Sequence, residues 1–295
     1  MLYRESGQFK TSYKADMAIF PIRQDLWGMI TTLIVAVVIV PLFASEHMIV
    51  GYLLPFMIWS IAAIGLNILT GYAGQLSLGH GAFMAVGAYS AYNLAARIPD
   101  LPLLAVFIGA GLIAAACGVV VGSPSLRIKG FYLAVATLAA QFFSEWVFAT
   151  FPWFVGGAAS MVIDTPRMSL FGYPIESNLD NYFLVLGFVI VTTLLAKNLV
   201  RSEIGRAWME VRDMDVAAEV IGIRPLYTKL SAFAVSSFFA GIAGALYAFC
   251  YVKSVDFTAF DLFVSLKVLF MIIIGGMGSI LGCFLGAGFI VILPI

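Results

Sequence analysis

The side chains in this sequence that could act on a solute are polar groups embedded in apolar segments. Residues 65–88 contain no Lys, Arg, Asp or Glu, yet they carry hydroxyl, amide and imidazole groups, namely those of Asn67, Thr70, Tyr72, Gln75, Ser77 and His80. Two isolated charges, Glu145 and Lys267, also lie within apolar segments. An ionisable residue at membrane depth is a functional candidate by default. We therefore interpret these eight residues as candidates for a translocation path.

The motifs of ATP-binding, metal-dependent and nucleophilic enzymes are absent from the sequence. No G-x-x-x-x-G-K-[ST], no H-E-x-x-H and no paired cysteine spacing occurs, so neither a P-loop nor a zinc site is indicated. Cys117, Cys250 and Cys283 lie in apolar segments and fit helix packing. No serine lies in a nucleophile elbow. We predict no catalytic residue, no metal and no cofactor, so ATP could drive this chain only through a separate subunit.

The composition places the elements that carry these side chains in a membrane. The chain has 295 residues, of which 62% are hydrophobic and 11% charged, whereas soluble domains carry about 25% charged residues. The net charge is zero, which gives no support for binding nucleic acid. A helix that crosses the bilayer needs about 20 apolar residues. Nine such runs occur, at 26–44, 48–69, 78–96, 101–122, 130–151, 182–200, 230–252, 262–275 and 278–294.

These runs predict an all-α polytopic fold with nine or ten transmembrane helices. The tenth would belong to a longer natural chain, because the ninth run reaches the end without a polar flank. About 25 mostly polar residues precede the first run, which is too long for the charged start of a signal peptide. We therefore expect residues 1–25 to be a cytoplasmic N-terminal segment, and residues 26–295 to be one transmembrane domain in contact with lipid.

The distribution of Lys and Arg predicts the orientation. With the N-terminus in the cytoplasm, twelve basic residues fall inside: Arg4, Lys10, Lys14, Arg23, Arg127, Lys129, Lys197, Arg201, Arg206, Arg212, Arg224 and Lys229. Only Arg97, Arg167 and Lys253 fall outside. Basic residues favour the cytoplasmic side. The bias therefore supports both the direction and the number of spans.

Two polar stretches interrupt the apolar runs. The outer one, 152–181, contains glycines and prolines typical of a loop. The inner one, 201–229, has helical spacing: Ala207, Val211, Met214, Ala218 and Ile221 form an apolar stripe. Glu203, Arg206, Glu210 and Asp213 form a charged face, and Gly222 suits a helix end. An amphipathic helix on the membrane surface is one interpretation. Its mixed charge favours the other, a helix that docks on a protein partner.

Three motifs resemble the permeases of branched-chain amino acid ABC importers of the high-affinity type. Residues 67–83, Asn-Ile-Leu-Thr-Gly-Tyr-Ala-Gly-Gln-Leu-Ser-Leu-Gly-His-Gly-Ala-Phe, are similar to the signature of that family almost word for word. Residues 203–223 are similar to its cytoplasmic loop, and residues 271–287 to its terminal glycine motif. The glycine-rich stretches lie in opposite halves of the chain, which is compatible with an internal repeat.

The resemblance implies a role for the inner loop. In the family this loop carries the coupling helix that docks on the ATPase subunit, here about residues 215–223. The matching positions are Glu203, Gly205, Arg206, Ala207, Arg212, Asp215, Ala217, Ala218, Glu219, Gly222 and Ile223.

The resemblance also implies a complex in the bacterial inner membrane. Its other members would be a second homologous permease subunit, two ABC ATPase subunits and a periplasmic solute-binding protein. The implied solute is a branched-chain amino acid, although relatives of this fold carry amides or urea. Whether the permeases pair as homodimers or heterodimers stays open.

Some residues depart from the family pattern or allow other interpretations. Lys267 stands where the family often has an acidic residue, and Val155, Ala158 and Ala159 replace polar residues of the outer loop. Residues 65–88 suit an interrupted helix that lines a path, but their glycines also suit tight helix packing. Glu145 could equally pair with a neighbouring helix.

Three other classes of function remain open from the sequence. An ion-driven secondary transporter would depend on Glu145 or Lys267, a passive channel would need no energy, and a membrane enzyme would turn over a substrate. The docking-like loop favours an ATP-driven importer over all three.

Overall fold

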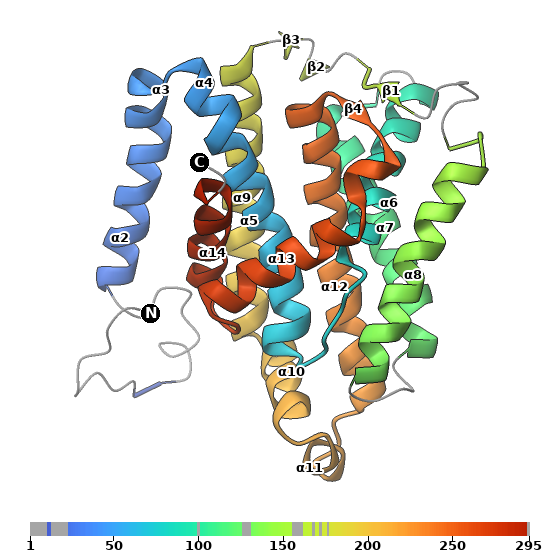
Figure 1. Ribbon diagram of the computed structural model, residues 1–295. Helices are drawn as coiled ribbons and strands as arrows, with labels where there is room; N and C mark the ends of the chain where they lie inside the picture. The colour runs from blue at the N-terminus through green and yellow to red at the C-terminus, as the bar shows by residue number, and fades with distance from the viewer. Residues whose placement is uncertain are drawn as a thin grey trace.

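The computed structural model describes residues 11–12, 23–98, 101–125, 131–154, 162–166, 169–170, 173–175 and 177–293. Helices account for almost all of the described chain (Figure 1), which confirms the all-α prediction. The N-terminal half contains α2 (Arg23–Ile34), η1 (Val35–Ile39), α3 (Val40–Phe43), α4 (Glu46–Met48), η2 (Ile49–Leu53), α5 (Leu54–Asn67), η3 (Ile68–Tyr72), α6 (His80–Arg97), α7 (Leu103–Ser125) and α8 (Phe131–Thr150).

The C-terminal half is also helical. Its helices are α9 (Asn178–Arg201), α10 (Glu203–Asp213), α11 (Asp215–Val220), α12 (Pro225–Leu246), η4 (Tyr247–Val252), η5 (Phe257–Phe260), α13 (Leu262–Gly275) and α14 (Ile280–Ile292). The π-helical segments η1 to η4 continue α-helices without a break in the chain direction, so α4, η2, α5 and η3 form one long rod.

Seven helices of the described chain are long and apolar enough to cross a membrane. They are Leu26–Phe43, Glu46–Tyr72, Leu103–Ser123, Tyr132–Thr150, Asn178–Arg201, Pro225–Val252 and Phe257–Gly275. The two remaining predicted runs also form helices, α6 and the shorter α14. A helix therefore lies within each of the nine runs, and the protein is a multi-pass membrane protein.

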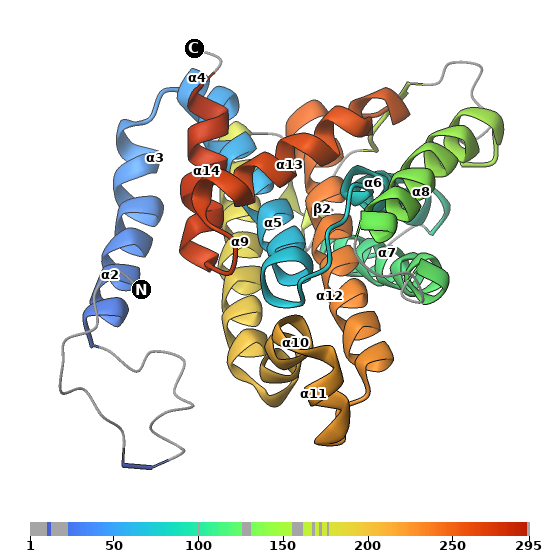
Figure 2. The same cartoon turned by 60° about the horizontal axis from the view of Figure 1, so that its bottom comes forward.

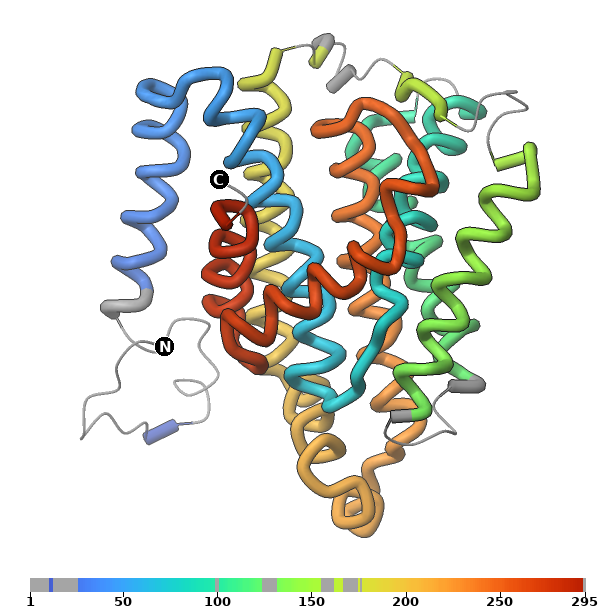
Figure 3. The backbone as a smooth tube through the Cα atoms, in the orientation of Figure 1, coloured from blue at the N-terminus to red at the C-terminus, as the bar shows by residue number. Residues whose placement is uncertain are grey.

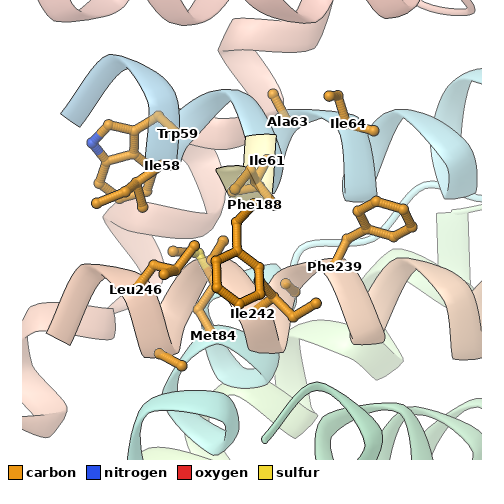
Figure 4. Close-up of a cluster of buried hydrophobic side chains, with 14 of the residues drawn as sticks. Ile58, Trp59, Ile61, Ala63, Ile64, Met84, Phe188, Phe239, Ile242 and Leu246 are labelled. Carbon is orange, nitrogen blue, oxygen red and sulfur yellow. The ribbon is translucent and has the colours of Figure 1, made fainter. Parts of the chain in front are cut away.

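The core lies where α5 and α12 cross the middle of the molecule. In the most apolar 18-residue stretches of these two spans, 72% and 78% of the residues are buried, whereas none is buried in Leu26–Phe43. That first span lies at the edge of the molecule (Figure 2) and contacts α9 through the hydrogen bond from Tyr182 OH to Ala36 O. Side chains of α5 and α12 interlock with Met84 of α6 and Phe188 of α9 (Figure 4). Exposed apolar side chains cover the outer helices, as expected for contact with lipid.

Small residues allow α6 and α12 to pack at close range. A side chain at Gly87 would collide with the backbone of Gly241, and one at Gly244 would collide with the backbone of Met84. Close approach through glycine is a common way to pack helices in membranes. Gly87 therefore serves packing, the alternative that the sequence had left open.

Short strands cover the end of the molecule opposite α11 (Figure 1). β1 (Ile163–Asp164) pairs antiparallel with β4 (Ser254–Val255), and β2 (Ser169–Leu170) pairs antiparallel with β3 (Tyr173–Pro174). The predicted outer loop therefore contains three of the four strands. Val155, Ala158, Ala159 and Arg167 lie outside the described residues, as do Arg127 and Lys129.

The inner loop protrudes from the other end, where α2 also begins (Figures 1 and 2). The sequence predicted one continuous apolar stripe from Ala207 to Ile221, and this prediction was wrong. The helix breaks at Met214, which has φ −153° and ψ 94° and separates α10 from α11. Met214 and Ile221 are 70% and 69% exposed, so only part of the predicted stripe faces the core.

Candidate translocation path and docking surface

The glycine-broken segment is the non-helical link at residues 73–79, between the end of η3 at Tyr72 and the start of α6 at His80. Gly74 has φ +68°, a conformation that glycine adopts without strain. Residues 74–79 are not helical, and the chain passes through them as an extended link to α6 (Figure 3). This is the interruption that the sequence predicted. It leaves backbone groups near Gln75 and Ser77 without the bonds of a continuous helix.

Asn67 joins this break to the second glycine-rich stretch. Its side-chain oxygen accepts a hydrogen bond from Gly278 N at 2.8 Å, and its amide nitrogen donates to Ser279 O at 3.3 Å. A side chain at Gly71 would lie 2.5 Å from Gly278 N, so only glycine allows this approach. The structure thus brings together two stretches more than 200 residues apart in sequence.

Arg212 connects the inner loop to the same break. Its Nη1 donates to Gly71 O at 2.9 Å, and a side chain at Gly74 would lie 2.5 Å from Arg212 Cγ. Arg212 Nε also donates to Asp213 Oδ1 at 2.8 Å. That hydrogen bond lowers the pKa of Asp213. Two motifs that sequence analysis treated separately, the loop and the broken segment, are therefore in direct contact.

Trp208 anchors α10 to the transmembrane helices. Its side chain is fully buried, and its Nε1 donates to Ser231 Oγ of α12 at 2.9 Å. Val211 is buried on the same side, and Gly205 is buried at the turn that follows α9, where a side chain would collide with the backbone of Val200. Sequence reasoning missed Trp208. The available signal was one large aromatic residue in an otherwise polar helix.

The other polar residues of the break have different surroundings. Thr70 Oγ1 donates to Gln75 O at 3.1 Å, and His80 Nε2 donates to Ala62 O at 3.0 Å. His80 and Ser77 are fully buried, which suits a structural role. The amide of Gln75 is also buried, but neither of its polar atoms has a hydrogen-bond partner among the described residues.

Glu145 belongs to a separate polar junction between α6, α8 and the start of α13. It accepts a hydrogen bond from Gln141 Nε2 at 2.9 Å. Gln141 Nε2 also donates to Phe260 O, and Gln141 Oε1 accepts from Ala82 N and from Ser265 Oγ. Gln141 and Ser265 are fully buried. Neither was among the predicted site residues, and this junction favours the structural interpretation of Glu145.

Lys267 does not pair with Glu145. Its Nζ lies 4.6 Å from the ring centroid of Trp59, as in a cation–π contact. Trp59 contacts Tyr247 at 5.3 Å between ring centroids, and Tyr247 contacts Tyr251 at 5.3 Å. An aromatic cluster therefore surrounds this charge.

Comparison with known proteins identifies the family. Residues 48–295 match the family described as "Branched-chain amino acid transport system / permease component". The chain belongs to this family. Two relatives, from Salmonella typhimurium and Escherichia coli, are each named "High-affinity branched-chain amino acid transport system permease protein LivM". Each is 31% identical over 261 residues, which cover 80% of this chain and 60% of the relative. No solved structure matches the chain.

The match to the permease family covers every motif behind the resemblance. It starts at residue 48 and so includes the break at 73–79, the inner loop and the second glycine-rich stretch. The chain spans about 60% of the length of the LivM relatives.

The predicted docking residues divide into exposed and buried groups in this permease. Glu203, Arg206, Ala217, Glu219 and Gly222 are exposed, and Gly222 has φ +93° at the end of α11. Ala207, Asp215 and Ile223 are partly buried, and Asp215 Oδ2 lies 4.0 Å from Lys229 Nζ. Ala218 and Gly205 are buried within the chain, so their side-chain positions cannot touch a partner. Sequence reasoning missed the exposed apolar residues of α11, Val216 and Val220.

Proposed function

We propose that this chain is the membrane-spanning permease subunit of an ATP-driven importer in the bacterial inner membrane. Its solute would be a branched-chain amino acid or a related small solute. The observation that carries the proposal is the match of residues 48–295 to the permease family. The printed names of both relatives, which contain "branched-chain amino acid transport system permease protein", support the same solute class.

The proposed complex contains a second homologous permease, two ABC ATPases and a periplasmic binding protein. ATP hydrolysis takes place in the ATPases, because the sequence contains no P-loop. The N-terminus and the loop at 201–229 lie in the cytoplasm, in agreement with the distribution of Lys and Arg. The strands β1 to β4 then lie on the periplasmic side, where the binding protein delivers the solute.

The docking surface of the proposed complex is α11 with its flanking residues. Met214, Val216, Val220 and Ile221 are 68–83% exposed at the tip of the inner loop. In the cytoplasm they would be exposed to water, and burial of one Val or Ile side chain contributes about 1.5–3 kcal/mol. A groove on the ATPase would cover them, as grooves cover amphipathic helices in other complexes.

The route of coupling runs from α11 through α10 to the glycine-broken segment. α10 is held to α12 by Trp208 and to the break by the bond from Arg212 to Gly71 O. When the ATPases close, a rigid movement of α10 would pull on η3 and on the link at 74–79. Helix shifts at subunit interfaces are a common form of such switching. Thr70, Tyr72 and Gln75 would then meet the solute, and Asn67 would transmit the movement to Gly278.

The test is to purify the tagged chain gently from its own membrane and identify the proteins that accompany it. We expect a Walker-A ATPase and a second permease in fixed ratio, and ATP-dependent leucine accumulation after reconstitution with the binding protein. A chain that purifies alone and moves solute along an ion gradient would instead be a secondary transporter. Flux without any energy source would indicate a channel.

A further inference from the structure

Lys267 places a positive charge near the middle of a helical segment that is long and apolar enough to cross a membrane. Ten residues precede it and eight follow it in the span Phe257–Gly275. Its ring partner Trp59 lies at the centre of Glu46–Tyr72, with thirteen residues on either side. At 1.5 Å per residue, each end of that span is about 20 Å from Trp59. A lysine side chain is far shorter, so the ammonium group cannot snorkel to either membrane surface.

Within the part of the chain that the structure describes, this charge has no partner of opposite sign. Among the described residues, no carboxylate oxygen lies within 4.0 Å of Lys267 Nζ, and no atom accepts a hydrogen bond from it. An ammonium group has three N–H donors, and the face of Trp59 satisfies the charge from one side only. A charge at this depth is costly unless it faces a polar cavity or a partner. Lys267 therefore has donors left to bind an anion.

The position of Lys267 on α13 shows where that anion would lie. Phe263, Phe270 and Ile274 share its side of the helix at spacings of four, three and four residues, and they are 76%, 51% and 51% exposed. Lys267 itself is partly exposed. Lys267 therefore lies at the edge of this exposed side, between these side chains and the buried ring of Trp59. In the complex of the proposed function, a second permease subunit would cover this side and enclose a polar path.

The aromatic side chains beside Lys267 suit an amphipathic ligand. Trp59 from α5, Tyr247 and Tyr251 from η4 and Phe260 from η5 form a continuous cluster, with Tyr247 5.7 Å from Phe260 between ring centroids. Tyr247 and Tyr251 are partly exposed. One cation beside an aromatic wall can hold a carboxylate and an apolar side chain at the same time. Apolar walls with few placed polar groups are typical of small-molecule sites.

We propose that Lys267, held over Trp59, binds the carboxylate of the solute on its way through the permease and thereby selects for small apolar acids. This inference rests on the proposed function. The phosphate of a lipid headgroup offers the same anionic chemistry, and the experiment below separates the two sources.

The experiment measures ATP-dependent uptake of radiolabelled leucine by the complete complex, reconstituted with its binding protein. Lys267→Gln is expected to lower uptake by about tenfold or more, the loss typical of one charge-assisted hydrogen bond. Lys267→Met removes the same charge with an unbranched apolar chain and is expected to do likewise. Lys267→Arg keeps the charge and should retain most of the uptake. Lys253→Gln is the matched control, since Lys253 is exposed outside the membrane centre, and it should behave like wild type.

Two further readouts separate solute from lipid. In a chain that keeps Lys267 and has Cys117, Cys250 and Cys283 replaced by alanine, leucine-loaded binding protein should slow the reaction of Tyr251→Cys with an anionic thiosulfonate. Adding Lys267→Gln to that chain should abolish the protection. The ratio of Lys267→Gln uptake to wild-type uptake should be the same in phosphatidylcholine vesicles with and without phosphatidylglycerol. A ratio that rises to one without the anionic lipid would assign Lys267 to a headgroup and overturn the proposal.

Two further outcomes separate a failure of this inference from a failure of the proposed function. Uptake by Lys267→Gln and Lys267→Met within twofold of wild type, with no protection by leucine, would overturn the inference alone. A wild-type complex that accumulates no leucine with ATP would overturn the proposed function and this inference together.

Discussion

The two helices of the inner loop, α10 and α11, differ in the burial of their apolar side chains. In α10, Trp208 and Val211 are buried against the transmembrane helices. In α11, which begins two residues after α10 ends, Val216 and Val220 are 68% and 83% exposed. The extended backbone of Met214 separates them. One helix is thus fixed to its own chain, and the other exposes its apolar residues, which is the arrangement that the proposed coupling element requires.

The largest effect is expected where the fixed helix is released. Trp208→Ala removes a fully buried aromatic side chain and leaves a cavity, which costs about 3–5 kcal/mol. We expect a marked loss of folded protein, measured as the monodisperse fraction after heating in detergent. Trp208→Phe keeps most of the volume and loses only the hydrogen bond to Ser231, so it should cost about 1 kcal/mol. Equal stability of Trp208→Ala and wild type would show that α10 is not anchored through this residue.

The next effect tests the exposed helix. Val220→Asp places a charge at the tip of α11, where the side chain touches little of its own chain. We expect normal folding and abundance, but at least about a tenfold loss of ATPase binding, because a desolvated unpaired charge opposes association. Val220→Thr has the same shape without the charge and serves as control. Pull-down of the ATPase measures the effect, and full retention by Val220→Asp would move the docking surface elsewhere.

The contrast between these helices also shows what the sequence could predict. The length of the apolar runs correctly located helices, because a helix that crosses a bilayer needs about 20 apolar residues. Helical spacing correctly identified the polar loop as helical. It did not show that the stripe breaks at Met214, because a helical period does not record where the backbone of a single residue becomes extended. The hydrogen bond from Arg212 to Gly71 O joins residues 141 positions apart, and no local pattern records such a contact. Gln141 and Ser265, which are 124 positions apart and hydrogen-bonded to each other, were not predicted as site residues for the same reason.

A smaller effect is expected at the contact between the fixed helix and the broken segment. Arg212→Gln loses the charge-assisted bond to Gly71 O, worth about 1.5–3 kcal/mol. Folding and ATPase binding should persist, while the amount of ATP hydrolysed for each solute imported should rise several-fold. Glu210→Gln is the control, because Glu210 is exposed on the same helix and was not among the predicted docking residues. An unchanged coupling ratio in Arg212→Gln would exclude this contact from the route.

The smallest effect is expected at Asp213, the exposed partner of Arg212. The hydrogen bond from Arg212 lowers the pKa of this carboxyl below its ordinary value of 3.8. A group with a lowered pKa in the folded state contributes stability above its unfolded pKa, and this contribution disappears only as the pH falls through the folded pKa. The ion pair should therefore be intact at every pH of about 6 to 8, where the carboxylate is ionised.

Because both side chains face water, such pairs contribute little. Asp213→Asn should therefore leave the coupling ratio within twofold of wild type and the pH profile of that ratio unchanged. A pH-dependent loss of coupling that Asp213→Asn abolishes would mean that the pair is covered in the complex. The docking surface would then extend from α11 onto the charged side of α10, and the division between a fixed helix and an exposed one would no longer hold.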